Sequence, residues 1–130
     1  MQELKTGITR EVKKVVTQAD TAKALGSGLA QVLSTPMLAA WMENAALLAV
    51  QPVLEEGRST VGTLLELKHL AASPVGMEVR VVATLAEIDR RCLTFEIEAF
   101  DKKEKVAEAR HQRFIIDAQA FQAKADAKLG

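Results

Sequence analysis

Hydrophobic and polar positions divide the chain into a first strand, a loop and a long apolar segment, followed by four further strands. Residues 7–16 place Ile8, Val12 and Val16 on even-numbered positions with charged residues between them, which predicts a half-exposed strand. Residues 20–34 contain two glycines and no strong period, so we expect a loop there with room for a short helical turn.

The segment from residue 37 to residue 50 is predicted to form a buried helix. It has no polar face, and a helix that is apolar on every side lies in a protein core. Thr35 and Pro36 precede it: the threonine hydroxyl is expected to cap free N–H groups, and proline suits the first helical position. Pro52 is expected to break the helix, and Gly57 to end the segment.

From residue 60 the hydrophobic period changes to two, which predicts strands at residues 60–70, 77–85, 91–99 and 105–116. Turns are expected at residues 73–76, 89–90 and 101–105, and a short, exposed, alanine-rich helix at residues 118–129. In the first three strands the odd-numbered positions form the mostly apolar face: Val61, Thr63, Leu65, Leu67 and His69; Met77, Val79, Val81, Ala83 and Leu85; Leu93, Phe95, Ile97 and Ala99.

This order of elements predicts an α+β fold formed by a single domain over residues 1–130. Strands grouped after one helix are typical of that class. We expect about five antiparallel strands, the last four a meander, whose one apolar face wraps around the long central helix. Hydrophobic residues make up 48% of the chain but aromatic ones only 4%, so the core is expected to consist of aliphatic side chains.

Charge and cysteine content narrow the classes of function. Seventeen basic and seventeen acidic residues cancel, which argues against a nucleic-acid binder and against an electrostatic membrane anchor. The single cysteine, Cys92, excludes an internal disulfide and fits a reducing compartment. The first residues lack the pattern of a signal peptide and no apolar run reaches about 18 residues, so we expect a soluble, cytoplasmic protein.

Two titratable residues interrupt apolar patterns and are therefore candidates for chemistry. Glu43 lies in the middle of the apolar helix, where desolvation would raise its pKa towards that of a general acid or base. Alternatively, it points to solvent at a subunit boundary or pairs with an arginine. His69 lies on the apolar side of its strand, where a lone histidine is more often a satisfied core residue. Because the sheet is expected to wrap the helix, both face a shared interior, which favours a site.

Three further residues each have a structural and a functional interpretation. Thr35 is first of all a helix cap, but a hydroxyl at a helix N-terminus can also contact an oxyanion. Gly62, inside a strand, marks either a bulge or the close approach of a ligand or another chain. Arg113 is either a buried ion-pair partner or a substrate clamp. His69 and His111 without a cysteine cluster lack the spacing of a metal site, so we expect no metal and no bound cofactor.

Four segments, in this order along the chain, give the sequence a specific resemblance. They are residues 35–43 (TPMLAAWME), 61–63 (VGT), 68–76 (KHLAASPVG) and 111–116 (HQRFII). With separations of eight residues from Thr35 to Glu43, 26 to His69 and 44 more to Arg113, the chain resembles the hotdog-fold acyl-CoA thioesterases of the fluoroacetyl-CoA thioesterase branch. The resemblance covers nearly the whole chain and implies the hotdog fold.

The resemblance also implies a site and an assembly. It implies that Thr35, Glu43 and His69 are the catalytic residues and that Gly62 and Arg113 contact or organise the substrate. In the family the glutamate acts as the nucleophile or as the base for water, the histidine handles protons, and the site sits at a homodimer interface. Coenzyme A enters only as part of the substrate.

One departure and two alternatives complete the expectation. The loop at residues 20–34 has no Phe or Tyr where the fluoroacetyl-specific enzyme carries a Phe-bearing gate, so the expected substrate is another small or medium acyl-CoA. The first alternative is a non-hydrolytic binding protein for acyl-CoA or small hydrophobes with the same fold. The second, a hotdog hydratase or dehydratase, ranks low because the Asp/His-type motif of that branch is not evident.

Overall fold

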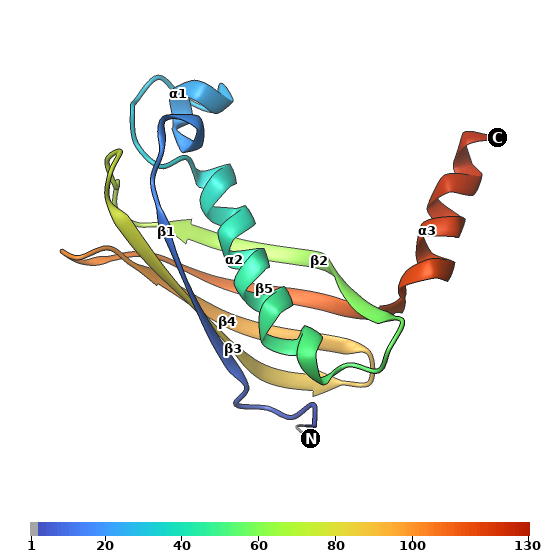
Figure 1. Cartoon of the computed structure of the whole chain (residues 1–130). Helices are drawn as coiled ribbons and strands as arrows, with labels where there is room; N and C mark the ends of the chain where they lie inside the picture. The colour runs from blue at the N-terminus through green and yellow to red at the C-terminus, as the bar shows by residue number, and fades with distance from the viewer. Residues whose placement is uncertain (1–2) are drawn as a thin grey trace.

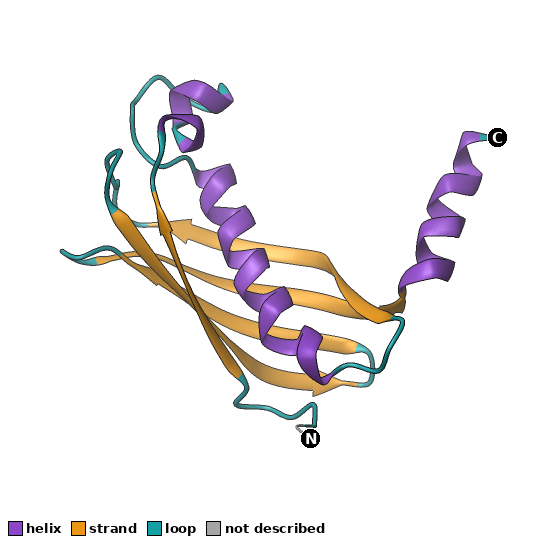
Figure 2. Ribbon diagram, in the orientation of Figure 1, coloured by secondary structure: helices purple, strands orange, loops and turns teal. Residues whose placement is uncertain are grey.

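One five-stranded antiparallel sheet, with a long helix across one of its faces, accounts for most of the chain (Figure 1). The computed structural model describes residues 3–130. The elements are β1 (Thr9–Val15), α1 (Ala22–Leu25), α2 (Thr35–Val50), β2 (Arg58–His69), β3 (Glu78–Asp89), β4 (Cys92–Phe100), β5 (Lys105–Asp117) and α3 (Ala118–Asp126), with short 3-10 helices at Gln18–Asp20, Gln51–Val53 and Ala127–Leu129. The predicted order of strand, loop, helix and four strands is confirmed, as is the exposed C-terminal helix, which stands away from the sheet (Figure 2).

The predicted meander of the last four strands is wrong. The strand order in the sheet is β1-β3-β4-β5-β2, so β2 lies at one edge beside β5 rather than beside β3. After β2 the chain crosses to the other side of the sheet, where the Gly76 N–H donates to the Val16 carbonyl and the Val16 N–H to that of Met77. A period of two identifies strands but carries no information about their neighbours, which is why the pattern alone missed this crossover.

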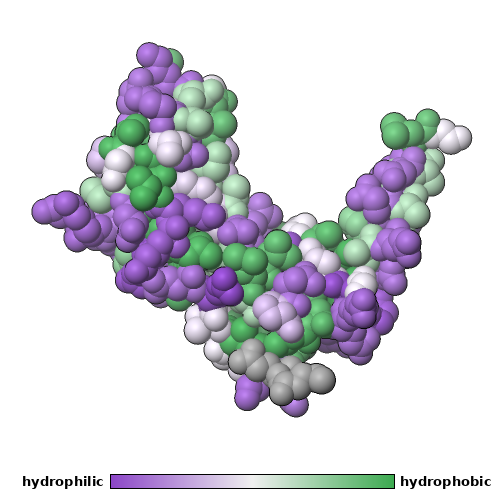
Figure 3. All heavy atoms as spheres, viewed as in Figure 1, coloured by the Kyte–Doolittle hydropathy of each residue, from purple (hydrophilic) through white to green (hydrophobic). Residues whose placement is uncertain are grey.

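The core forms between α2 and the inner faces of β3 and β4, as their alternation predicts. Eight side chains on these two strands are at most 1% exposed: Val79, Val81, Ala83, Leu85, Leu93, Phe95, Ile97 and Ala99. From α2 the buried residues are Leu38, Trp41, Met42, Ala45, Ala46, Ala49 and Val50. Trp41 and Phe95 are the two aromatic residues among the buried hydrophobic ones, so the expected aliphatic core is confirmed. Hydrophobic residues gather where helix and sheet meet (Figure 3).

A bulge in β2 changes which of its residues face α2. Gly62 pairs with Arg113 and Leu64 with Gln112, so Thr63 is an extra residue without an opposite partner. Before the bulge the even positions face inward, since Thr60 is buried and Gly62 lies against an α2 side chain. After the bulge the odd positions face inward, and the predicted inward placement of His69 is confirmed by its contact with Thr35. The inward placement predicted for Val61 and Thr63 is wrong because the extra residue reverses the alternation.

Helix α2 begins one residue earlier than the sequence suggested. The buried Ser34 hydroxyl, not that of Thr35, accepts a hydrogen bond from the Met37 N–H at 3.1 Å. Thr35 is therefore the first helical residue, and Pro36 follows in the first turn, where no intrahelical donor is lost. The prediction that Thr35 is the cap is wrong, and its hydroxyl is left free for another partner.

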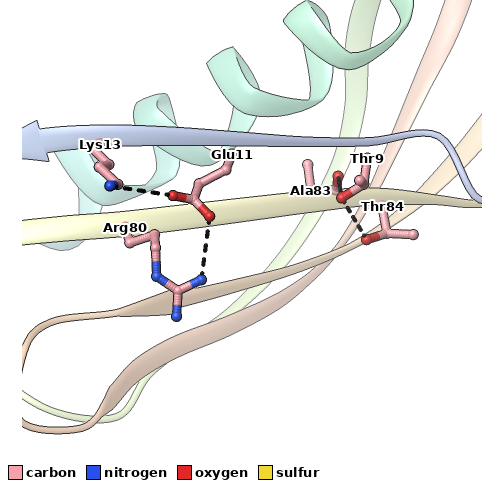
Figure 4. A network of polar contacts seen from close by, with 6 residues as sticks. All are labelled: Thr9, Glu11, Lys13, Arg80, Ala83 and Thr84. Atoms are coloured by element: carbon pink, nitrogen blue, oxygen red, sulfur yellow. Dashed lines mark hydrogen bonds and ion pairs between the residues drawn. The ribbon is translucent and has the colours of Figure 1, made fainter.

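The two edge strands of the sheet differ in length and charge. β1 has seven residues, four of them charged, and its side chains bind across to β3: Glu11 lies 3.5 Å from Arg80, and the Thr9 hydroxyl donates to the Ala83 carbonyl (Figure 4). β2 has twelve residues, three of them charged. A short, charged edge resists pairing with another chain, whereas a long edge with few charges favours it.

No helix within residues 3–130 has the length and apolar character needed to cross a membrane. The long apolar stretch identified in the sequence instead forms α2, which packs against the sheet.

The capping assignment can be tested with two adjacent variants. We expect Ser34→Ala to lower the free energy of unfolding by about 1 kcal/mol, because the Met37 N–H loses its acceptor. Thr35→Ala, the matched control, should lower it by less, because Thr35 is exposed and its hydroxyl caps no helix N–H. Chemical denaturation at one fixed protein concentration measures both values, and a larger loss for Thr35→Ala would contradict the assignment.

Candidate active site

Thr35 and His69 form a hydrogen-bonded pair at one end of α2. Thr35 Oγ1 lies 2.8 Å from His69 Nδ1, although 34 residues separate them in sequence. Thr35 is exposed in the first turn of α2, and His69 is the half-buried last residue of β2. Both line a cleft of about 350 Å³ between the loop that precedes α2 and residues 70–72. The structure thus brings together two residues that the sequence singled out.

The surroundings of His69 favour its neutral form. Burial lowers the pKa of the imidazole below 6.5, and the backbone carbonyl of Ala71 opposes this effect in part. A neutral imidazole at pH 7 can accept a proton. His69 Nε2 is buried and has no hydrogen-bond partner among the residues that the structure describes. One ring nitrogen is thus engaged by Thr35, and the other is available for a further hydrogen bond.

Glu43 belongs to a second group of polar residues, further along α2. The half-buried Glu43 carboxylate lies directly over Gly62, since a Cβ added at Gly62 would be 2.7 Å from Glu43 Oε2. The same Cβ would be 3.2 Å from His111 Cε1 and 3.4 Å from Arg113 Nη1. Of the two interpretations of Gly62, the bulge is confirmed, and the group that approaches its backbone in the structure is a carboxylate of the same chain.

Arg113 is held behind Gly62 by neutral partners. It is 6% exposed; its Nε donates to Thr60 Oγ1 at 2.7 Å and its Nη2 to the Thr60 carbonyl at 2.9 Å. Within residues 3–130 no carboxylate lies within 4 Å of the guanidinium, so Arg113 makes no close ion pair. Burial lowers the pKa of Arg113 while the negative charge of Glu43 raises it, and an arginine remains charged in such a setting.

His111 is the member of this group that the sequence did not assign to the site. It is fully buried and donates its Nδ1–H to the Leu64 carbonyl at 2.7 Å. Its Nε2 lies 3.2 Å from Arg113 Nη1. The signal for it was present, because residues two apart on a strand share a face and His111 is two residues before Arg113. Thr60 carried no such signal. The bulge lies between Thr60 and His69, so the alternation that places His69 on the inner face does not extend back to Thr60.

Within one chain, Glu43 lies far from the pair formed by Thr35 and His69. Eight residues separate Thr35 from Glu43 on α2, which corresponds to about 12 Å along a helix axis. Gly62, under Glu43, and His69 pair with Arg113 and Ala107 of β5, six residues apart, which corresponds to about 20 Å along a strand. Glu43 and the pair of Thr35 and His69 are both on the inner side of β2. Within a single chain, however, one thioester carbonyl cannot contact Glu43 and this pair at the same time.

The two groups together provide the components of acid–base chemistry. They contain a hydroxyl bound to a neutral imidazole, and a carboxylate and a guanidinium that both adjoin Gly62 without forming an ion pair. In the described part of the chain, no three His, Cys, Asp or Glu side chains are grouped so as to hold a metal ion. These are the kinds of group that attack an activated carbonyl when they act together, with a carboxylate as the nucleophile or base and an imidazole that transfers protons.

Comparisons of sequence point to one family. The model of the fluoroacetyl-CoA-specific thioesterase family matches residues 16–119. The fluoroacetyl-CoA thioesterase of Streptantibioticus cattleyicolor is 33% identical over 94 residues, which cover 72% of this chain and 68% of that protein.

Comparisons of structure point the same way. A structure of the fluoroacetyl-CoA thioesterase superimposes with a TM-score of 0.92 at 28% identity, covering 98% of each chain. A thioesterase superfamily member from Thermus thermophilus gives 0.89 at 26% identity, covering 98% of this chain and 94% of that one. A hot-dog-like protein from Thermanaerovibrio acidaminovorans, 22% identical, gives 0.88 with 96% and 93% covered, and shows likeness of fold.

The two histidines provide a test of the electrostatics. Burial lowers the pKa of both His69 and His111, so we expect both imidazoles to titrate below pH 6.5 in the folded protein. In this range the unfolded chain then binds more protons, and the free energy of unfolding should fall as the pH drops below 6.5. Proton NMR of the two ring signals measures the midpoints, with His69→Gln to assign them. Midpoints at or above 6.5 would contradict the expectation.

Proposed function

The chain belongs to the fluoroacetyl-CoA-specific thioesterase family, and on that premise we propose that it hydrolyses an acyl-CoA thioester to a free acid and coenzyme A. The resemblance drawn from four sequence segments is confirmed, and the family is one of thioester hydrolases. The observation that carries the proposal is the hydrogen bond between Thr35 and a neutral His69 beside an open cleft, since this pair occupies the positions that the family resemblance assigns to catalysis.

A small or medium acyl group is the proposed substrate. The cleft beside Thr35 and His69 has a volume of about 350 Å³, near the lower end of the range for ligand sites. Its lining includes small side chains such as Ala22, Ser27 and Ala72. The loop before α2 lacks the aromatic residues expected of a fluoroacetyl-specific gate, which favours a different acyl group.

The active site is proposed to form between two copies of the chain. Glu43 and the pair of Thr35 and His69 are too far apart in one chain to act on the same carbonyl, but a partner subunit can supply the missing component. The long β2 edge is free of any strand partner within residues 3–130, which makes it the preferred edge for pairing. Closed two-fold dimers are the commonest homo-oligomers.

Antiparallel pairing of two β2 edges brings the two groups together. If the two-fold axis passes through Glu66, Gly62 of one subunit lies opposite the partner's His69, because Thr63 is the extra residue of the bulge. Glu43, which lies over Gly62, then approaches the partner's Thr35 and His69, and the symmetric site forms at the other end. The proposed homodimer therefore has two composite sites, each with residues from both subunits.

Two routes of hydrolysis fit this site. In the first, a Glu43 oxygen attacks the thioester carbon, the coenzyme A thiolate leaves, and water hydrolyses the resulting anhydride. In the second, Glu43 removes a proton from water as it attacks the carbonyl directly. In the first route His69 takes a proton from the water that hydrolyses the anhydride and passes it to the coenzyme A thiolate. In the second route the proton that Glu43 takes from water passes through His69 to the departing sulfur. In either route Thr35 orients the imidazole. Both routes use side chains and water, with coenzyme A entering as part of the substrate.

Removal of either proposed catalytic group tests the function. We expect Glu43→Gln and His69→Ala to lower thiol release from acyl-CoA by at least about a hundredfold, because each removes a group that acts in the chemical step. Thiol release is measured over a panel from acetyl- to octanoyl-CoA, with circular dichroism to verify folding. Near wild-type turnover in both variants would refute the assignment, and tight acyl-CoA binding without thiol release by the wild-type protein would favour the binding-protein alternative.

Mixing the two inactive variants tests the composite site. A dimer of one Glu43→Gln chain and one His69→Ala chain has one intact site if Glu43 acts with the partner's His69. After random exchange of equal amounts, half of the dimers are mixed, so activity should recover to about a quarter of the wild-type value. Each variant incubated alone is the control. Mass spectrometry verifies that mixed dimers have formed. If they have formed and activity does not recover, each site lies within one chain.

A further inference from the structure

A buried polar network behind Gly62 fixes the protonation pattern of His111. A carbonyl oxygen only accepts, so the contact of 2.7 Å with Leu64 requires a proton on His111 Nδ1. In the neutral ring Nε2 then carries a lone pair, which accepts the N–H of Arg113 Nη1 at 3.2 Å. His111 therefore links the Leu64 carbonyl, beside the bulge, to the buried guanidinium.

The same network fixes the orientation of the Arg113 guanidinium. Its Nε donates to Thr60 Oγ1, one Nη2 proton is donated to the Thr60 carbonyl, and one Nη1 proton to His111. Three of the five N–H groups of a planar, rigid guanidinium are thus engaged, which fixes the directions of the other two. One of these remaining groups is on Nη1.

Arg113 Nη1 and the Glu43 carboxylate both adjoin Gly62. Nη1, His111 Cε1 and Glu43 Oε2 all lie within 3.4 Å of the point where Gly62 would carry a Cβ. The charge of Glu43 affects both neighbours, since it raises the pKa of His111 and of Arg113 against the effect of burial. A neutral acceptor at position 111 leaves the positive charge of Arg113 uncompensated, whereas a carboxylate there would form an ion pair with it.

We propose that His111 is a positioning residue, which holds the Arg113 guanidinium so that its positive charge faces the Glu43 carboxylate during hydrolysis. The role rests on the proposed thioesterase function. His111 acts through Arg113, and the rate of the chemical step depends on how accurately such charged groups are held.

Two amide variants separate the two hydrogen bonds of His111. An asparagine amide reaches the position of Nδ1 and can donate to Leu64, but it cannot reach Arg113. A glutamine amide reaches the position of Nε2 and can accept from Arg113, but it loses the bond to Leu64. Each variant removes one buried hydrogen bond, so the two should lose similar thermal stability.

The expected result is a difference in kcat between variants of similar stability. His111→Asn should lower kcat for thiol release at least tenfold with KM changed less than about threefold, whereas His111→Gln should keep kcat within about threefold of wild type. If the wild-type enzyme is active and His111→Asn and His111→Gln lose kcat equally, the positioning role is refuted while the proposed function stands. Absence of thiol release from the wild-type enzyme with every acyl-CoA would refute the proposed function, and with it this role.

Two further measurements serve if a His111 variant does not fold. Nitrogen-15 NMR of the wild-type protein at pH 7 should show a protonated Nδ1 and an unprotonated Nε2 for His111, and the opposite tautomer would overturn the proposal. Thr60→Val removes the acceptor of Arg113 Nε, while Thr60→Ser retains the hydroxyl. We expect Thr60→Val to lower kcat and Thr60→Ser to retain it, and equal kcat in the two would also overturn the proposal.

Discussion

Burial of α2 against the sheet is the constraint on which the candidate site depends. Leu38, Met42 and Ala45 are completely buried, and each large apolar side chain removed from water contributes about 1.5–3 kcal/mol. Because these residues fix the rotation of the helix about its axis, the polar residues between them have fixed directions too. Thr35 then meets His69 at the end of β2, and Glu43 meets Gly62 near its beginning. The packing of the core thereby sets the separation between the two polar groups.

The charge of Arg113 presents a second physical problem, since a buried cation without a close carboxylate is costly. The protein offsets this cost with hydrogen bonds to the Thr60 hydroxyl and carbonyl and to the His111 ring, and with the more distant charge of Glu43. These interactions stabilise the cation without forming an ion pair with it. The same cation therefore remains able to interact with a carboxylate, a developing negative charge or a substrate.

Sequence reasoning identified the features that depend on local periodicity. The inner faces of β3 and β4 followed from apolar spacing. The body of α2 followed from its lack of a polar face, and the interruption by Glu43 was visible for the same reason. The crossover after β2 could not be predicted because strand neighbours depend on contacts between distant segments. A bulge was one of two interpretations of Gly62, but the identity of Thr63 as the extra residue depends on pairing with β5 and not on the residues of β2 alone. The placement of His111 could have been predicted from its spacing to Arg113. The partners of its two ring nitrogens could not, because they depend on the three-dimensional arrangement of β2 and β5.

The adjacent positions 34 and 35 separate folding from chemistry. Ser34 is buried and caps the N-terminus of α2, while Thr35 is exposed and hydrogen-bonded to the His69 imidazole. A single residue with both duties could change only at the expense of one of them. With the duties divided, a substitution at position 35 changes the group bound to the imidazole while Ser34 still holds the start of the helix.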